Sequence, residues 1–350
     1  MKTEVDSHRL SFHPERVAEW VRKGDCFPIY VEVGPTNSCN HRCIFCALDY
    51  LEKGGFSINR DVMVAALKDM AENGVKSVMF AGEGEPLLHK DICEFVIEAK
   101  NLGLDISITT NGVLLDRQKA EKIIPGLSWI RFSLDAGTKE NYGKIHGTRE
   151  EDFPKVISNI KNSVRIKKEL GLNTTIGVQL LLIPNNIKES LNAARIIKEI
   201  GADNIQIKPY SHHPSSKNDF SVDYSNLDWL ESELKKLGDK TFQVSFRKNT
   251  MQRIEDGRDY NECFGLPFFT LIDAKGNVIP CNLFYNLPEF YYGNLNEKSF
   301  SEIWKSEQRK KVIEKIKETK LSSCRAGCRL DPANKYLKQL KNPHPHVNFI

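Results

Sequence analysis

The sequence alternates short apolar segments with amphipathic segments of helical period, and this alternation constrains the fold more than any other feature of the chain. Runs rich in β-branched and apolar residues predict strands, and the longer segments between them predict helices. Strands that alternate with helices form a parallel sheet covered by helices. The predicted strands are residues 28–33, 75–81, 104–109, 129–134, 174–183 and 204–208, and the predicted helices between them are residues 61–73, 91–102, 116–124, 153–170 and 188–200.

Six strand–helix units predict an α/β fold of the barrel type over residues 29–247. A helical segment is expected before it, within residues 1–28, where Pro14 opens a short helix. Residues 248–350 contain a second group of cysteines and are expected to form a small α+β extension with a tail. In βα barrels the ligands collect on loops at the carboxyl ends of the strands, so we expect functional residues directly after each predicted strand.

The composition excludes several classes of function. Lys and Arg exceed Asp and Glu by only four, and no basic block marks a nucleic-acid partner. No run approaches the ~18 apolar residues needed to span a bilayer, and the polar N-terminus shows no signal segment, so we expect a cytoplasmic protein without a membrane partner. Nine cysteines in such a chain favour metal or redox chemistry over disulfides.

Three of the cysteines, Cys39, Cys43 and Cys46, have the spacing C-x3-C-x2-C directly after the first predicted strand. A [4Fe–4S] cluster normally binds four thiolates, so a triplet leaves one iron open to a ligand from outside the protein. The alternatives are a zinc knuckle or three buried structural thiols. A structural zinc site closes with four ligands, and the only nearby candidate for the fourth is His41.

With Phe45 as the aromatic residue before the third cysteine, the triplet resembles the signature of the radical S-adenosylmethionine (radical SAM) superfamily. The resemblance implies a partial (β/α)6 barrel and a [4Fe–4S] cluster whose open iron chelates S-adenosylmethionine. It also implies a flavodoxin- or ferredoxin-type electron donor. In the superfamily, one electron from the reduced cluster cleaves S-adenosylmethionine to a 5′-deoxyadenosyl radical, which abstracts hydrogen from the substrate.

The segment after the second predicted strand resembles the GGEP motif, which in the superfamily binds the amino group of S-adenosylmethionine. Gly84, Glu85 and Pro86 match the end of that motif, whereas Glu83 stands where its first glycine usually does. Taken alone, the segment is more typical of a plain turn with a solvated glutamate. Beside the cysteine triplet, we interpret Gly84, Glu85 and Pro86 as cofactor-binding residues.

Three further strand ends carry polar residues of the same kind. Asn111 lies in a Thr-Asn-Gly segment that is common in the superfamily and also typical of a simple turn. Ser133 and Asp135 resemble a motif that contacts the ribose and carboxylate of the cofactor, and their alternation predicts that both point to one face of the strand end. Gln179 interrupts an apolar strand and is expected to face the cofactor or the substrate.

Residues after the sixth predicted strand are the candidates for substrate binding and proton transfer. Lys208, Tyr210 and His212 place a cation, a phenol and an imidazole at the predicted barrel mouth, followed by His213. For the two histidines a solvated loop is an equally good interpretation. His146, after a helical segment, is expected to be structural.

A second group of cysteines follows the predicted barrel. Segments 269–272 and 278–280 flank a turn with glycine and predict a hairpin, which brings Cys263 and Cys281 together, and Cys324 and Cys328 form a later close pair. The spacing of these four thiols suits zinc and a fully ligated cubane equally. The segment resembles the SPASM extension of radical SAM enzymes, and four cysteines fit its shortened "twitch" version with one auxiliary [4Fe–4S] cluster.

The resemblance implies a radical SAM oxidoreductase. A fully ligated cluster cannot chelate the substrate, so it would accept an electron, which favours oxidation of a sugar, aminocyclitol or similar small polyol. A peptide maturase that forms a crosslink or an oxidised residue is the alternative within the family. A molybdopterin-type GTP cyclase fits less well, because the cysteine pattern and the chain end differ. The alternative from another class is a non-catalytic protein that binds iron–sulfur clusters or zinc.

Overall fold

The computed structural model describes residues 8–218 and 220–349, and residues 1–7 of the predicted N-terminal segment lie outside this part. The strands in it are β1 (Tyr30–Val33), β2 (Ser77–Phe80), β3 (Asp105–Thr110), β4 (Trp129–Ser133), β5 (Thr175–Leu182), β6 (Asn204–Pro209), β7 (Gln243–Phe246), β8 (Phe269–Ile272), β9 (Asn277–Ile279) and β10 (Gly293–Asn294). The α-helices are α1 (Pro14–Lys23), α2 (Arg60–Glu72), α3 (Ile92–Asn101), α4 (Arg117–Ile123), α5 (Lys139–His146), α6 (Asp152–Glu169), α7 (Ser190–Ile200), α8 (Asp228–Leu237), α9 (Lys248–Asp256), α10 (Phe300–Lys305), α11 (Glu307–Lys317) and α12 (Asp331–Lys341).

In the described residues, all strands belong to one ten-stranded sheet with the order β10-β9-β8-β1-β2-β3-β4-β5-β6-β7. The strands from β8 through β1 to β7 pair in parallel, and β9 and β10 continue the sheet antiparallel beyond β8. Its two edge strands, β7 and β10, do not pair with each other. The fold is therefore an open, curved α/β barrel, as the sequence predicted.

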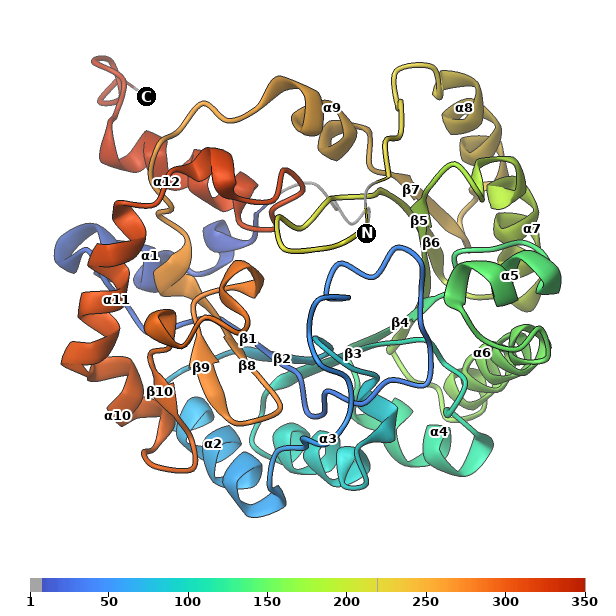
Figure 1. Ribbon diagram of the computed structural model, residues 1–350, viewed down its shortest axis with the longest axis horizontal. Coiled ribbons are helices and arrows are strands. Elements are labelled where there is room, and N and C mark those ends of the chain that lie inside the picture. Colours follow the sequence, from blue (N-terminus) through green and yellow to red (C-terminus); the bar gives the residue numbers. More distant parts are fainter. Residues whose placement is uncertain (1–7, 219, 350) are drawn as a thin grey trace.

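The sheet has an apolar outer side and a polar inner side. In β4, Ile130 and Phe132 are buried, whereas Arg131 and Ser133 are half-buried. Successive side chains of a strand point to opposite faces, so the first pair packs under the helices and the second pair faces inward. Figure 1 shows α2, α3, α4, α6 and α7 around the outside of the curve and the chain between β1 and α2 across its inside. We call this inner side the concave face.

The six predicted strands are confirmed to within two residues at each end. Beyond them, β7 adds a further parallel strand next to β6, and β8 adds one next to β1. Residues 243–246 alternate polar and apolar side chains over only four positions, a pattern too short to predict a strand by itself. The predicted boundary after residue 247 falls between β7 and α9.

The predicted hairpin of the C-terminal region is confirmed as β8 and β9, and it is continuous with the sheet because Tyr30 of β1 pairs with Phe269 of β8. Behind it, the guanidinium of Arg309 on α11 is buried, stacks 3.8 Å from the ring centroid of Trp304, and binds both carboxylate oxygens of Asp25 at 2.7 Å. This ion pair ties the C-terminal helices to the segment between α1 and β1.

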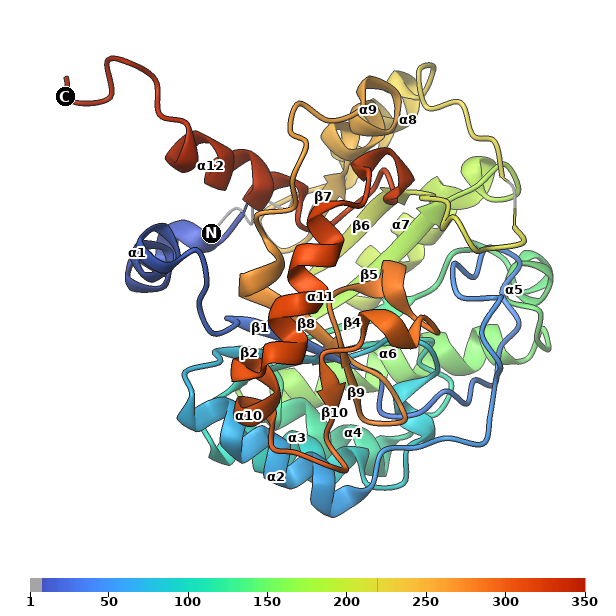
Figure 2. The same cartoon turned by 60° about the vertical axis from the view of Figure 1, so that its left-hand side comes forward.

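Helices α1 and α12, from opposite ends of the chain, lie side by side next to β8 (Figure 2). Their contact is a small apolar cluster that includes Trp20 of α1, Leu337 of α12, and Phe264 and Phe268 before β8. Within the described part of the chain, every helix is too short or too polar to cross a lipid bilayer.

Candidate active site

The cysteine triplet lies on the loop between β1 and α2, which crosses the concave face. Backbone hydrogen bonds fix this loop to the end of α5: Arg42 N donates to His146 O and Ile44 N donates to Ile145 O, both at 2.9 Å. All three thiols are half-buried and form no disulfide. Burial raises the pKa of Cys39 and Cys43, and the neighbouring cysteines raise it further. A bound cation would remove this penalty, so the triplet is suited to metal.

Two glycines allow neighbouring loops to approach the cysteine loop. A Cβ on Gly84 would lie 2.3 Å from Thr36 O and 2.4 Å from Ser38 O, and a Cβ on Gly147 would lie 2.3 Å from Arg42 O. Contacts this short do not occur between real atoms, so only glycine fits at either position without a shift of the backbone. Gly84, which was predicted as a cofactor-binding residue, therefore also allows the loop after β2 to pack against the cysteine loop.

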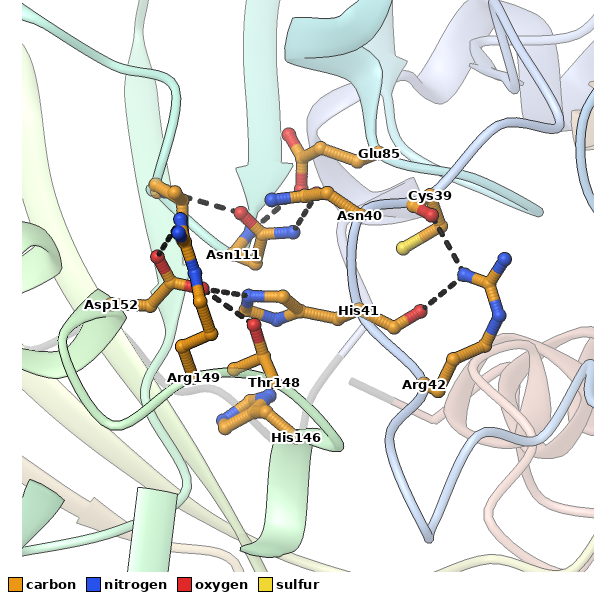
Figure 3. Close-up of polar contacts among 12 residues, drawn as sticks. Cys39, Asn40, His41, Arg42, Glu85, Asn111, His146, Thr148, Arg149 and Asp152 are labelled. Atoms are coloured by element: carbon orange, nitrogen blue, oxygen red, sulfur yellow. Dashed lines mark hydrogen bonds and ion pairs between the residues drawn. The ribbon is translucent and has the colours of Figure 1, made fainter. Parts of the chain in front are cut away.

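Glu85 is buried under the cysteine loop and holds the ends of β2 and β3 together (Figure 3). Its carboxylate accepts hydrogen bonds from Thr110 Oγ1 at 2.6 Å, from Asn111 N at 2.7 Å and from Leu87 N at 3.1 Å. Burial nevertheless raises the pKa of this carboxyl. The interpretation of this segment as a plain turn with a solvated glutamate is therefore wrong for Glu85. Pro86, also buried, begins the next short 3-10 helix.

Asn111 links this network to the cysteine loop. Its Nδ2 donates to Oδ1 of Asn40 at 2.8 Å, and its Oδ1 accepts from Val113 N at 3.1 Å (Figure 3). Asn40 was not predicted as a site residue, because its role depends on a contact between segments 71 positions apart.

Two buried histidines stand beside Cys43. His146 Nδ1 lies 3.2 Å from Cys43 Sγ, its Nε2 bonds to Leu134 O at 2.9 Å, and its ring contacts the rings of His41 and Phe45. Burial lowers the pKa of His41 to about 4 and that of His146 to about 3. Figure 3 shows His41 directed toward Asp152, whose Oδ2 is 3.8 Å from Nε2.

A row of polar side chains crosses β4, β5 and β6 on the concave face. Gln179 donates through Nε2 to Ser133 Oγ at 2.8 Å and accepts through Oε1 from Lys208 Nζ at 3.1 Å. Asp135 differs from Ser133 in its backbone conformation and in its partner. Its φ is positive, at 52°, and its buried Oδ1 accepts a hydrogen bond from Leu181 N at 2.6 Å. Burial raises the pKa of Asp135 to about 7.

The loop after β6, residues 210–218, contacts both cysteine regions. Asn218 Nδ2 donates to Cys46 O at 2.9 Å, and Ser211 Oγ accepts from Gly327 N at 3.0 Å. His213 is fully buried, so a solvated loop is the wrong interpretation for this residue. Its Nε2 lies 3.3 Å from Tyr50 Oη, near the triplet, and 3.1 Å from Asn282 O, next to Cys281.

Of the three residues predicted for substrate binding and proton transfer, only Lys208 joins the polar row. The Tyr210 hydroxyl donates to Asn218 O at 3.1 Å, and His212 Nδ1 lies 2.9 Å from the same oxygen. Tyr210 is buried and His212 is exposed. Both side chains therefore brace the loop after β6.

The second cysteine group is assembled from three segments. Cys263 precedes β8, Cys281 follows β9, and Cys324 and Cys328 lie between α11 and α12. Burial raises the pKa of Cys263 to about 12 and also raises the pKa of Cys281 and of Cys324, and neighbouring thiols of the group add to each rise. Asn334 Nδ2 lies 3.7 Å from Cys263 Sγ. The four thiols thus form one half-buried group that is suited to a cationic centre.

Among the described residues, the group of three or more ligating side chains whose ligand atoms all lie within 4.8 Å of one another is His41, Cys43 and His146. This group contains one cysteine of the triplet and the two histidines beside it.

Comparison with known proteins supports an iron–sulfur centre at each of the two cysteine groups. Residues 33–197 match the family "Radical SAM superfamily", and residues 263–329 match the SPASM family, described as an iron–sulfur cluster-binding domain. These domains imply a [4Fe–4S] cluster with bound S-adenosylmethionine and an auxiliary iron–sulfur cluster. The SPASM match answers the choice between zinc and iron that the spacing of the second group left open.

Two curated relatives and one solved structure are similar to this chain. The chain is 30% identical to a probable GTP 3′,8-cyclase of Methanocaldococcus jannaschii, over 65% of this chain and 73% of that protein. It is 26% identical to the tungsten-containing aldehyde ferredoxin oxidoreductase cofactor-modifying protein of Pyrococcus furiosus, over 80% of this chain and 81% of that protein. Streptococcus suis SuiB, solved with S-adenosylmethionine, shares the fold, with a TM-score of 0.70 and 18% identity over 96% of this chain and 80% of SuiB.

The cysteine triplet on the concave face, the buried strand ends around it and the sequence matches lead to one assignment. The chain belongs to the radical SAM superfamily and carries a C-terminal SPASM domain.

Proposed function

We propose that this radical SAM enzyme oxidises a small hydroxylated substrate by two electrons and that the SPASM cluster accepts one of them. The observation that carries the proposal is the loop after β6. Asn218 binds the carbonyl of Cys46, and Ser211 binds the amide next to Cys328, so one short loop fixes both cysteine regions. A substrate held under this loop would be close to both centres, as a coupled hydrogen and electron transfer requires.

The proposal assigns each group of residues a role. Cys39, Cys43 and Cys46 would hold the cluster that binds S-adenosylmethionine, and the second cysteine group would hold the auxiliary cluster. When bound, these groups supply a 5′-deoxyadenosyl radical, which takes a hydrogen atom, and an acceptor for one electron. The residues proposed to position S-adenosylmethionine are Phe45, Gly84, Glu85, Pro86, Asn111, Ser133, Asp135 and Gln179.

The protein's own contribution is to position the reacting groups. Glu85 is held by three donors, so its carboxyl group cannot rotate freely and has a fixed orientation near the triplet. Gln179 joins Ser133 to Lys208 and aligns three neighbouring strands on the concave face. The oxidation also releases one proton, and the roles of Tyr210 and His212 in its transfer remain predictions. The proposed barrel comprises residues 29–247, and the proposed extension comprises residues 248–350.

The alternative substrate is a peptide. SuiB has also been solved with its precursor peptide SuiA, at a TM-score of 0.69 to this chain, but the 18% identity supports the fold alone. The names of the two curated relatives point to different products again, a cyclised nucleotide and a modified cofactor. Two-electron oxidation is therefore the feature of the proposal that an experiment must address.

The test measures product oxidation and cofactor cleavage together. Anaerobically reconstituted, reduced enzyme is incubated with polyols, aminocyclitols and peptides, and 5′-deoxyadenosine is quantified beside the substrate-derived product. We expect a product lighter by two hydrogens. A variant with Cys324 and Cys328 changed to Ala should still form 5′-deoxyadenosine but yield no oxidised product, and Cys93→Ala is the matched control. A product of wild-type enzyme with no net oxidation would contradict the proposal.

A further inference from the structure

Two cationic side chains on the concave face have no carboxylate partner. Arg131 of β4 and Lys208 of β6 point inward from strands on either side of β5. Among the described residues, no Asp or Glu oxygen lies within 4.0 Å of either cation. Within residues 8–218 and 220–349, the Lys208 ammonium donates only to the neutral amide of Gln179, at 3.1 Å. Arg131 stacks its guanidinium 4.6 Å from the ring centroid of Trp129.

Two buried polar atoms, one on Arg131 and one on Asn204, also have no hydrogen-bond partner among the described residues. The Nε atom of Arg131 is buried and has no hydrogen-bond partner. In the same row of the sheet, Arg131 pairs with Gly177 and Gly177 pairs with Asn204, whose Oδ1 is likewise buried without a partner. A buried polar atom without a partner costs free energy, so two of them in one row indicate a place where a ligand completes the hydrogen bonds.

The surrounding charges are mostly positive. Arg329, next to Cys328, also reaches the concave face, where it binds Glu32 and donates to the Tyr30 hydroxyl at 2.9 Å. Glu32 is therefore already engaged and does not neutralise Arg131 or Lys208. Burial lowers the pKa of Lys208 to about 7, the positive charges of Arg131, Arg247 and Arg329 lower it further, and the carboxylate of Asp135 opposes them. An anion at this position would reverse that effect and restore the charge of the ammonium.

We propose that the substrate carries an anionic group, a carboxylate or a phosphate, which binds to Arg131 and Lys208 on the concave face. A guanidinium can donate two parallel hydrogen bonds to either oxyanion, and the ammonium adds a third contact. This inference rests on the proposed function, because it assigns a chemical class to the substrate of the same site. It restricts the small hydroxylated substrates to acidic ones, such as hydroxy acids or phosphorylated polyols.

Binding of simple anions tests the inference without knowledge of the substrate. Inorganic pyrophosphate and citrate are titrated by calorimetry into the reconstituted enzyme, with glycerol as the neutral comparison. Wild type is expected to bind at least one of the anions and not glycerol. Arg131→Gln and Lys208→Gln should each weaken binding about tenfold or more, whereas Arg165→Gln, on the exposed side of α6, should leave binding unchanged. The stronger of the two anions indicates phosphate or carboxylate.

Several outcomes would overturn the inference. The first is that wild type binds neither anion, and the second is that both variants bind the anion with wild-type affinity. The third is that saturating S-adenosylmethionine displaces the anion completely, which would mean that the cations hold the carboxylate of the cofactor. Circular dichroism and iron content verify that each variant is folded, and two independent variants protect the test against failure of one. Formation of 5′-deoxyadenosine by wild type is measured separately. An enzyme that cleaves the cofactor but binds neither anion refutes this inference alone, whereas one that binds anions without cleavage refutes the proposed function alone.

Discussion

The two cysteine groups are similarly buried, but they are assembled from the chain in different ways. The triplet comes from one loop, and neighbouring strand ends secure that loop through Gly84, Glu85 and Asn111. The second group combines a hairpin with a segment more than forty residues later, so its geometry depends on the sheet and on the packing of α11. A centre built on one loop should therefore be sensitive to local changes, and a centre built from three segments should be sensitive to the stability of the fold.

The largest effect is expected at the triplet for Gly84→Ala. The added Cβ would lie 2.3 Å from Thr36 O, so the cysteine loop must shift. We expect iron to fall from about eight to about four atoms per chain, with loss of 5′-deoxyadenosine formation. Gly34→Ala is the matched control, because its Cβ would meet its nearest atoms at an ordinary 3.5 Å. Full iron content in Gly84→Ala would mean that the two centres do not differ in local sensitivity.

The second group should respond instead to Arg309→Gln. This change removes the charge that binds both oxygens of Asp25 and stacks on Trp304. Because the guanidinium is buried, we expect a loss of about 3 kcal/mol in unfolding free energy, measured by denaturant titration, and weaker retention of the auxiliary iron. Lys310→Gln, at an exposed ion pair with Glu307, should change neither property. Equal effects of the two variants would contradict the role of Arg309.

A smaller, pH-dependent effect is expected at Glu83, which joins the two regions. Its Oε1 accepts from Ala274 N at 2.6 Å in the hairpin turn, and burial raises its pKa from 4.5 to about 7. The folded protein therefore resists ionisation of Glu83 and loses stability as the pH rises from about 4.5 to 7.

Glu83→Gln should remove this loss while it keeps an oxygen for Ala274 N. The variant is expected to be more stable than wild type by about 2 kcal/mol above pH 7, with no difference near pH 4. Denaturant titrations at several pH values, with the exposed Glu297→Gln as control, measure the difference. A stabilisation that is independent of pH would show that ionisation of Glu83 is not its source.

Sequence patterns predicted the features of the fold that depend on residues close together in the chain. Strand alternation located β1 to β6, and the spacing of the triplet located its loop, because both depend on residues close together in sequence. The turn with Gly276, whose φ is 83°, likewise predicted the β8–β9 hairpin. The parallel pairing of β8 with β1 was not predicted, since no short segment encodes which distant strand becomes its neighbour.

The polar interior was harder to predict for the same reason. Asn40, His41 and His213 acquire partners from remote segments, and the surrounding loops gave no signal that distinguishes them from solvated residues. Arg131 lay within a predicted strand, where alternation with Ile130 and Phe132 could have assigned it to the inner face. Its lack of a carboxylate partner became visible only after β4, β5 and β6 were in register.

Iron content measured together with 5′-deoxyadenosine formation tests the central claim most directly. We predict about eight iron atoms per wild-type chain, and about four in each of two variants that replace either the triplet or the second cysteine group by Ala. The triplet variant should form no 5′-deoxyadenosine, whereas the variant of the second group should still form it. Wild type with about four iron atoms, all lost with the triplet, would contradict the claim that the chain holds two clusters with different roles.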